Sequence, residues 1–307
     1  MLRLAFVFPG QGSQYVGMGQ ELAAVYEAAG EVFARADQIC GYSLSSLCFT
    51  GPEEMLNQTR YAQPALLVTS LACLAAARAH GLSAVCMSGL SLGEYSALVG
   101  AGAIPLEKAL PLVIRRAELM QDAVPLGQGA MAAIIGLDDV TVAEVCREQE
   151  GIVTVANYNC PGQLVISGEK AAVESAARRL KEKGAKTMLL AVSVPSHSPL
   201  MKACSEQFAQ IVAGVGFEQP QVPVVSNVTA APYDVGDIPS LLVQQLYSPV
   251  RWEQSVRWMM TIADYFVEVG PGSSLSGLIK KIDKSRFLGQ IDNFKSLTKL
   301  IEKVNSI

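Results

Sequence analysis

The chain has 307 residues, 50% of them hydrophobic and 17% charged, which is enough to bury a large core in one domain or in two smaller ones. Its formal net charge of −4 argues against bulk nucleic-acid binding, which needs a basic surface. The chain has two histidines, His80 and His197, so a histidine-rich metal site is not expected.

The first part of the chain alternates short apolar runs with longer stretches of helical spacing. Leu4–Phe8 ends at Pro9-Gly10 and predicts a buried strand that leads into a loop. The predicted elements that follow are helices over 20–39 and 63–79, a strand over 84–87, and helices over 91–101 and 106–123. This order predicts an α/β layer built on a parallel sheet.

The segment from Gly129 to Val194 has a different order of elements. The predicted elements are a strand over 131–137, a helix over 140–150, strands over 152–157 and 164–168, a helix over 171–183 and a strand over 187–194. This β-α-β-β-α-β order is ferredoxin-like. We therefore expect a small domain of residues 127–195 inserted into a large α/β domain formed by residues 1–126 and 196–307. A cleft between two such domains is a favoured position for a ligand.

After Pro199 the alternation of helices and strands resumes. Strands are predicted over 222–226 and 265–269, and the VGPG turn at 269–272 leads into another helix. The last dozen residues have the spacing of an amphipathic helix in the outer layer.

Cysteine usage and hydropathy bear on where the protein works. The seven cysteines are scattered and form no CxxC pair, which predicts reduced thiols in the cytoplasm. The N-terminal apolar run is too short for a signal peptide. The longest apolar stretch, over 65–77, is well short of a membrane span. We therefore expect a soluble cytoplasmic protein with no membrane partner.

Gly89-Leu90-Ser91-Leu92-Gly93 fits the pattern G-x-S-x-G between a predicted strand and a predicted helix. In that setting a sharp turn projects the serine oxygen, and the glycines keep neighbouring side chains away from it. The same residues with Glu94 also read S-x-x-E, a capping box in which Ser91 only starts the helix. The pattern alone leaves both interpretations open.

Eight segments, in the same order along nearly the whole chain, resemble the malonyl-CoA:acyl carrier protein transacylase family. They are FVFPGQGSQYVGMG at 6–19, GLSLGEYSALVGAGA at 89–103, RRAELMQ at 115–121, GAMAAIIGLDD at 129–139, NYNCPGQLVISG at 157–168, VPSH at 194–197, QLYSPVRW at 245–252 and VEVGPG at 267–272. Together they are highly specific, although no single one is. The resemblance favours a catalytic Ser91 and implies an α/β fold with a hydrolase-like parallel sheet core and an inserted ferredoxin-like small domain.

The resemblance also implies roles for particular residues. Ser91 would attack a thioester and carry the acyl group as an ester, and His197 would take and return the proton. Arg116 would pair with the malonyl carboxylate, because a planar guanidinium can hold a carboxylate with two parallel hydrogen bonds. Considered without the resemblance, Arg116 could be a solvated helix residue, and a lone histidine is more often structural than catalytic.

The remaining roles belong to backbone groups. Gln11 and Leu92 would supply the N–H groups of an oxyanion hole, and Gln245 would orient His197 through a backbone carbonyl. One position departs from the family pattern: histidine usually precedes the active serine, whereas this chain has Leu90. That histidine is not the general base, so the departure affects the tuning of the acyl pocket or of the serine.

The implied activity is transfer of malonyl from malonyl-CoA to the phosphopantetheine thiol of an acyl carrier protein, through a malonyl-serine intermediate, in fatty-acid or polyketide synthesis. Such ping-pong chemistry needs no metal or redox cofactor, and a monomer would suffice. Two alternatives stay open. A serine hydrolase would share Ser91 and His197 but have no use for Arg116, and an idle carrier-binding scaffold would be expected to lack the serine or the histidine.

Overall fold

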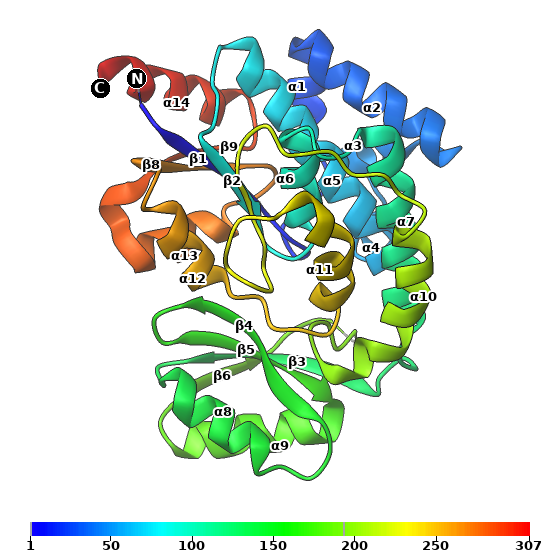
Figure 1. The fold of residues 1–307 in the computed structure, drawn as a ribbon, viewed down its shortest axis with the longest axis vertical. Helices are drawn as coiled ribbons and strands as arrows, with labels where there is room; N and C mark the ends of the chain where they lie inside the picture. The colour runs from blue at the N-terminus through cyan, green and yellow to red at the C-terminus, as the bar shows by residue number, and fades with distance from the viewer. Residues whose placement is uncertain (1, 193) are drawn as a thin grey trace.

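The structure is a computed structural model that describes residues 2–192 and 194–307. The chain forms a larger body around one sheet and a smaller body around a second sheet, and its two termini lie on the same side of the larger body (Figure 1). This arrangement confirms the predicted fold class.

The large sheet has five parallel strands in the order β7-β2-β1-β8-β9. Their bounds are β1 (Leu4–Phe8), β2 (Cys86–Gly89), β7 (Val224–Val225), β8 (Tyr265–Val269) and β9 (Phe287–Ile291). Alternate residues of β1 pack into different apolar clusters, Phe6 and Phe8 into one and Ala5 and Val7 into another. The central strand is therefore buried on both faces, which explains why its sequence is a continuous apolar run.

Helices cover the large sheet. The helices before the small sheet are α1 (Gln20–Val25), α2 (Glu27–Cys40), α3 (Leu44–Thr50), α4 (Glu53–Leu56), α5 (Thr59–Ala79), α6 (Gly93–Gly100) and α7 (Leu106–Asp122). Those after it are α10 (Lys202–Val212), α11 (Ile238–Gln245), α12 (Trp252–Met259), α13 (Ser274–Asp283) and α14 (Phe294–Ser306), with short 3₁₀ turns at 199–201, 235–237 and 284–286.

The small sheet is antiparallel, with its four strands in the order β4-β5-β3-β6. In chain order the elements are β3 (Gly129–Ile135), α8 (Asp139–Arg147), β4 (Val153–Cys160), β5 (Gln163–Glu169), α9 (Lys170–Glu182) and β6 (Lys186–Leu189). This is the predicted ferredoxin-like order. The sheet is joined to the larger body at β4, where the Val250 N–H donates to the Ala156 carbonyl (2.8 Å) and the Tyr158 N–H donates to the Val250 carbonyl (2.9 Å).

Several local predictions were wrong. The single helix predicted over 20–39 is two helices, because the backbone at Tyr26 is extended (φ −111°, ψ 112°) and ends the first one. Helices α3 and α4 and strand β9 were not predicted. The strand predicted over 187–194 ends at Leu189, and Ser193 within that range lies outside the described residues.

Helix α5 begins at Thr59, before the start at residue 63 that was predicted for it. It has 21 residues and is long and apolar enough to cross a membrane by length and composition, but 83% of that apolar window is buried inside the structure. Among the described residues it is the one helix that meets this test. Burial on nearly all sides is typical of a core helix of a large domain.

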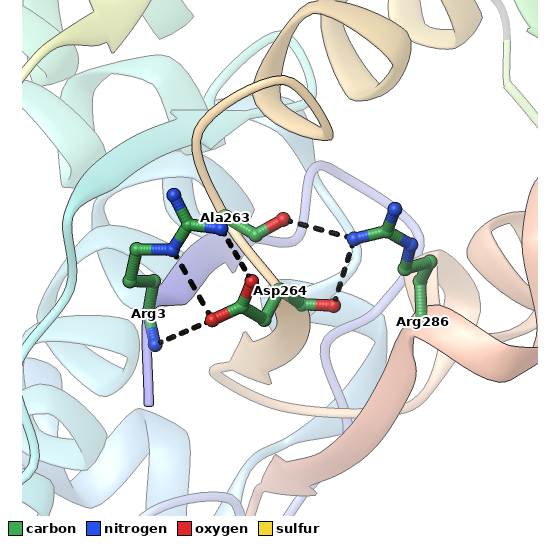
Figure 2. A network of polar contacts seen from close by, with 4 residues as sticks. All are labelled: Arg3, Ala263, Asp264 and Arg286. Carbon is green, nitrogen blue, oxygen red and sulfur yellow. Dashed lines mark hydrogen bonds and ion pairs between the residues drawn. The ribbon is translucent and has the colours of Figure 1, made fainter. Parts of the chain in front are cut away.

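At the amino ends of β1 and β8 an exposed polar cluster joins three segments of the chain (Figure 2). The Arg3 guanidinium donates to both carboxylate oxygens of Asp264, at 2.6 and 3.2 Å. Arg286 donates to the backbone carbonyls of Ala263 (3.2 Å) and Asp264 (3.3 Å). The cluster therefore links the start of β1 to the start of β8 and to the segment before β9.

Candidate active site

Ser91 lies in the turn between β2 and α6, at the carboxyl end of the large sheet. Its backbone is left-handed (φ 54°), a conformation that residues with a side chain rarely adopt. A Cβ on Gly89 would lie 1.9 Å from the carbonyl carbon of Gly93, and a Cβ on Gly93 would lie 2.1 Å from the carbonyl oxygen of Phe8. The turn therefore needs glycine at both positions.

The structure does not contain the alternative capping box. The residue before α6 is Leu92, and no side chain caps that helix end. The Ser91 hydroxyl instead contacts His197 and Arg116. The Glu94 carboxylate instead accepts hydrogen bonds from Asn227, Tyr233 and Gln245.

His197 lies beside the serine. Its Nε2 is 2.8 Å from Ser91 Oγ, and its Nδ1 is 2.7 Å from the main-chain carbonyl oxygen of Gln245. Because a carbonyl can only accept, Nδ1 carries the proton and Nε2 is free to accept the serine proton. Burial, followed by the charge of Arg116, lowers the pKa of His197 from 6.5 to about 4. The imidazole is therefore neutral at physiological pH, as a general base must be.

Arg116 on α7 is completely buried. Its guanidinium donates to Ser91 Oγ (3.2 Å), Gln245 Oε1 (2.8 Å) and Gln63 Oε1 (2.6 Å). Among the described residues no carboxylate oxygen lies within 4.0 Å of it. A buried arginine whose hydrogen-bond acceptors are all neutral oxygens, and which lies over the Tyr95 ring (5.3 Å to the centroid), is poised to take an anionic partner.

Gln11 and Leu92 follow the adjacent parallel strands β1 and β2, whose ends are in register at Phe8 and Gly89. Across the described chain, neither backbone N–H has a hydrogen-bond acceptor. Both residues line the same cavity as Ser91 and His197. Two unpaired N–H groups beside a nucleophile are suited to bind the oxygen of a tetrahedral intermediate.

The cavity beside these residues has a volume of about 280 Å³. Polar side chains of the small sheet line one part of it, namely Asn157, Asn159 and Gln163. The apolar part is lined by Leu90, Met120, Met131, Val165, Leu190, Val192, Val194, Leu275 and Leu278. The site thus lies between the two sheets, where the predicted cleft would be. Leu90 faces this space and packs with apolar residues of the large body.

Several residues around the site were missed from the sequence. Asn227 accepts from the Ser91 N–H (2.7 Å) and donates to the Gly89 carbonyl (2.7 Å), so it braces the turn from the neighbouring strand. Gln63 and Tyr233 were also missed, and Glu94 was considered only as a helix cap. One signal could have found Asn227: it follows a buried strand at the carboxyl edge of a parallel sheet, where ligands bind.

His80, the other histidine, lies outside this site. It ends α5, and its Nε2 is 2.8 Å from the Tyr26 hydroxyl. Within residues 2–192 and 194–307 no group of three His, Cys, Asp or Glu side chains could hold a metal ion.

The comparison with known proteins first identifies the class of protein to which the chain belongs. Residues 5–301 match the family model described as "Acyl transferase domain". The malonyl CoA-acyl carrier protein transacylase of Escherichia coli O157:H7 is 50% identical over 288 residues, which cover 92% of this chain and 93% of that protein. The Bacillus subtilis (strain 168) protein of the same name is 46% identical over 290 residues, covering 92% of each.

Solved structures agree with these relatives. An acyl carrier protein S-malonyltransferase from Vibrio cholerae has a TM-score of 0.93 at 45% identity, covering 96% of this chain and 99% of that one. A malonyl-transacylase in complex with a type II polyketide synthase acyl-carrier protein has a TM-score of 0.95 at 44% identity, covering 98% and 99%. The chain belongs to the malonyl-CoA:acyl carrier protein transacylase family, which confirms the family expected from the sequence.

Proposed function

We propose that this chain transfers malonyl from malonyl-CoA to the phosphopantetheine thiol of an acyl carrier protein, with Ser91 as nucleophile. The observation that carries the proposal is Arg116, a completely buried cation that touches the serine hydroxyl and has no carboxylate partner among the described residues. A general serine hydrolase has no use for such a charge. Malonyl differs from acetyl by one carboxylate, which would supply the missing partner.

In the first half-reaction Ser91 Oγ attacks the thioester carbonyl carbon while its proton moves to His197 Nε2. The oxygen of the tetrahedral intermediate is held by the N–H groups of Gln11 and Leu92. When the intermediate collapses, the C–S bond breaks, the imidazolium returns its proton to the CoA sulfur, and malonyl stays on Ser91 as an ester. Gln245 keeps the imidazole in the required tautomer through its carbonyl oxygen.

The second half-reaction runs the same steps with a different thiol. His197 takes the proton of the phosphopantetheine thiol, and the sulfur attacks the ester carbonyl carbon. The same two N–H groups hold the new oxyanion, the C–O bond to Ser91 breaks, and the serine oxygen recovers its proton from the imidazolium. Since the thioester already activates the acyl group, this chemistry uses no metal and no redox cofactor.

Arg116 would select the acyl group. In this structure the guanidinium contacts Ser91 Oγ (3.2 Å), and Arg116 is not among the described residues that line the cavity. A malonyl carboxylate therefore reaches it by replacing neutral oxygen acceptors such as Ser91 Oγ. Two charge-assisted hydrogen bonds from the guanidinium would compensate the carboxylate for the water it loses on entering the site.

The setting of the activity is part of the same proposal. We place the enzyme in the cytoplasm as a monomer that meets malonyl-CoA and an acyl carrier protein in turn. The seven cysteines are free thiols, which suits a reducing compartment. We also propose that residues 127–195 form a separate small domain and that residues 1–126 and 196–307 form the catalytic domain, since the strands of the small sheet all lie between Gly129 and Leu189.

Intact-mass spectrometry after incubation with malonyl-CoA tests the proposal. The wild-type chain should gain one malonyl group, and holo-acyl carrier protein should discharge it faster than water does. Ser91→Ala should gain no malonyl group while its circular dichroism spectrum stays unchanged. A folded Ser91→Ala protein that is still acylated on a serine would contradict the assignment, and discharge to water at the same rate would favour the hydrolase.

A further inference from the structure

A buried carboxylate lies under the serine turn, and the mechanism above gives it no role. Glu94, on the first turn of α6, has no exposed surface. It accepts hydrogen bonds from Gln245 Nε2, from the Tyr233 hydroxyl and, at 3.2 Å, from the Asn227 N–H. Burial raises the pKa of Glu94 to about 7, while these hydrogen bonds oppose the rise. A carboxylate held out of water in this way is costly and calls for an explanation.

Gln245 connects this carboxylate to the reacting groups. Its Nε2 donates to Glu94 and to the Ser91 carbonyl oxygen (3.0 Å), and its Oε1 accepts from Arg116 (2.8 Å). Its main-chain carbonyl accepts from His197 Nδ1 (2.7 Å). One residue therefore touches the nucleophile, the base and the arginine at once.

The two ends of the Gln245 amide are not interchangeable in this position. A carboxylate can only accept hydrogen bonds and a guanidinium can only donate them. With Glu94 on one side and Arg116 on the other, the amide nitrogen must face Glu94 and the amide oxygen must face Arg116. Without the Glu94 charge, only neutral acceptors, the Ser91 carbonyl (3.0 Å) and Asn227 Oδ1 (3.5 Å), would hold the amide nitrogen on that side. A flipped amide would place its NH₂ against the guanidinium, and Arg116 would lose one of its three acceptors.

We propose that Glu94 is a positioning residue that fixes the orientation of the Gln245 side chain and thereby aligns both Arg116 and His197 with Ser91. This inference rests on the proposed function, because it assigns Glu94 a part in malonyl selection. It predicts that losing the Glu94 charge weakens recognition of the acyl carboxylate and the alignment of the base together.

Glu94→Gln tests the inference with little change in volume. The variant amide offers a donor as well as an acceptor, so the charged group that favours one orientation of Gln245 is lost and the neutral Ser91 carbonyl is left to oppose a flip. We expect kcat/KM for malonyl-CoA to fall by about ten- to a hundredfold, the range in which a small misplacement of a reacting group acts. For acetyl-CoA only the misalignment of His197 should count, so the loss should be smaller and the preference for malonyl should narrow.

Glu268→Gln is the matched control. Glu268 is also completely buried, and its pKa is also raised to about 7 by burial, but it accepts from the Leu275 and Ser276 N–H groups at the start of α13. This change should lower the melting temperature and leave the ratio of malonyl to acetyl kcat/KM unchanged. A Glu94→Gln variant that behaves in the same way would overturn the positioning role.

Gln245→Met tests the same link if Glu94→Gln fails to fold. It keeps the main-chain carbonyl that holds His197 and removes the amide between Glu94 and Arg116. We expect the malonyl preference to narrow in this variant too, and an unchanged preference would overturn the inference. A wild-type chain that forms no malonyl ester would instead overturn the proposed function. An active wild type beside an unaffected Glu94→Gln variant would overturn this inference alone.

Discussion

Arginines meet polar partners at both ends of the large parallel sheet, and the two arrangements differ in almost every physical respect. At the amino ends, Arg3 and Asp264 form an ion pair whose side chains are 57% and 37% exposed (Figure 2). At the carboxyl ends, Arg116 is completely buried, and the oxygens around it belong to a serine and two glutamines. One arginine has its counter-ion in direct contact, and the other has a carboxylate, Glu94, only across Gln245.

This difference shows how to distinguish a structural arginine from one that serves a reaction. Water solvates an exposed guanidinium, so the presence or absence of an ion-pair partner for Arg3 changes the free energy of unfolding only slightly. A buried guanidinium without a counter-ion is unfavourable, and a chain that only needed stability would replace it or pair it. The incomplete partner set of Arg116 therefore indicates a ligand, whereas the complete one of Arg3 indicates a contact between strand ends.

The largest expected effect at the buried end comes from removing the base. His197→Ala should slow both acylation and deacylation by roughly two to four orders of magnitude, because one imidazole serves both half-reactions. Rapid-mixing measurements of malonyl-ester formation and discharge would check each step. Activity within a few-fold of wild type would show that another group is the base.

The next effect separates substrates. Removing one member of a buried charge pair costs roughly 2–5 kcal/mol, and about 1.4 kcal/mol is a factor of ten. Arg116→Ala should therefore reduce kcat/KM for malonyl-CoA more than tenfold, while kcat/KM for acetyl-CoA should fall little or rise. Equal losses for the two substrates would make Arg116 structural and would remove the contrast with Arg3.

A smaller effect appears in the pH profile. Glu94, whose pKa is about 7, should add a smaller rise of kcat/KM near neutrality, and His197, which acts in its neutral form, should produce a larger rise through about pH 4, the lower limb of the profile. Arg116 contributes to the lowered pKa of His197, so Arg116→Ala should move this limb to higher pH. Acetyl-CoA is the substrate for this measurement, since it adds no charge. An unmoved limb would mean that burial alone sets the pKa.

The smallest effect is expected at the exposed end. Hydrogen bonds from Arg3 lower the pKa of Asp264 below its ordinary value, so the pair stabilises the fold above the unfolded pKa of this carboxyl group, and that stability is lost as pH falls through the lower folded value. Asp264→Asn should slightly lower the melting temperature at neutral pH, with no difference at strongly acidic pH and no change in activity. A clear loss of transfer activity would show that this cluster also serves the site.

Local patterns predicted the elements that carry the nucleophile, because their determinants lie within a few residues. Leu4–Phe8 is apolar on both faces and is a buried strand, and the glycines around Ser91 mark a turn that tolerates no side chains. The strand over 287–291 was missed, since its polar and glycine residues hide the pattern. The break at Tyr26 was missed because the helical spacing continues across it.

The rest of the site could not be predicted from local pattern. His197 lies 106 residues after Ser91, and apart from the small number of histidines and its place at the predicted domain crossing, the family resemblance linked the two. Glu94 fits a capping box equally well, so nothing in the sequence signals that its side chain turns inward toward Gln245. Tyr233 reaches the site through long-range packing, which no short segment encodes, whereas the place of Asn227 directly after a predicted strand was a usable signal.

The backbone at the two proposed reacting residues has a consequence for protein engineering. Ser91 (φ 54°) and His197 (φ 60°) both hold a left-handed conformation that suits glycine better than a residue with a Cβ. Such positions cost on the order of 1–3 kcal/mol each. Replacing Ser91 with glycine should therefore yield an inactive protein that is harder to melt, whereas at the buried His197 a cavity and an unpaired Gln245 carbonyl would offset the relief. A screen that selects for thermal resistance alone would favour the change at Ser91, so activity must be selected together with stability.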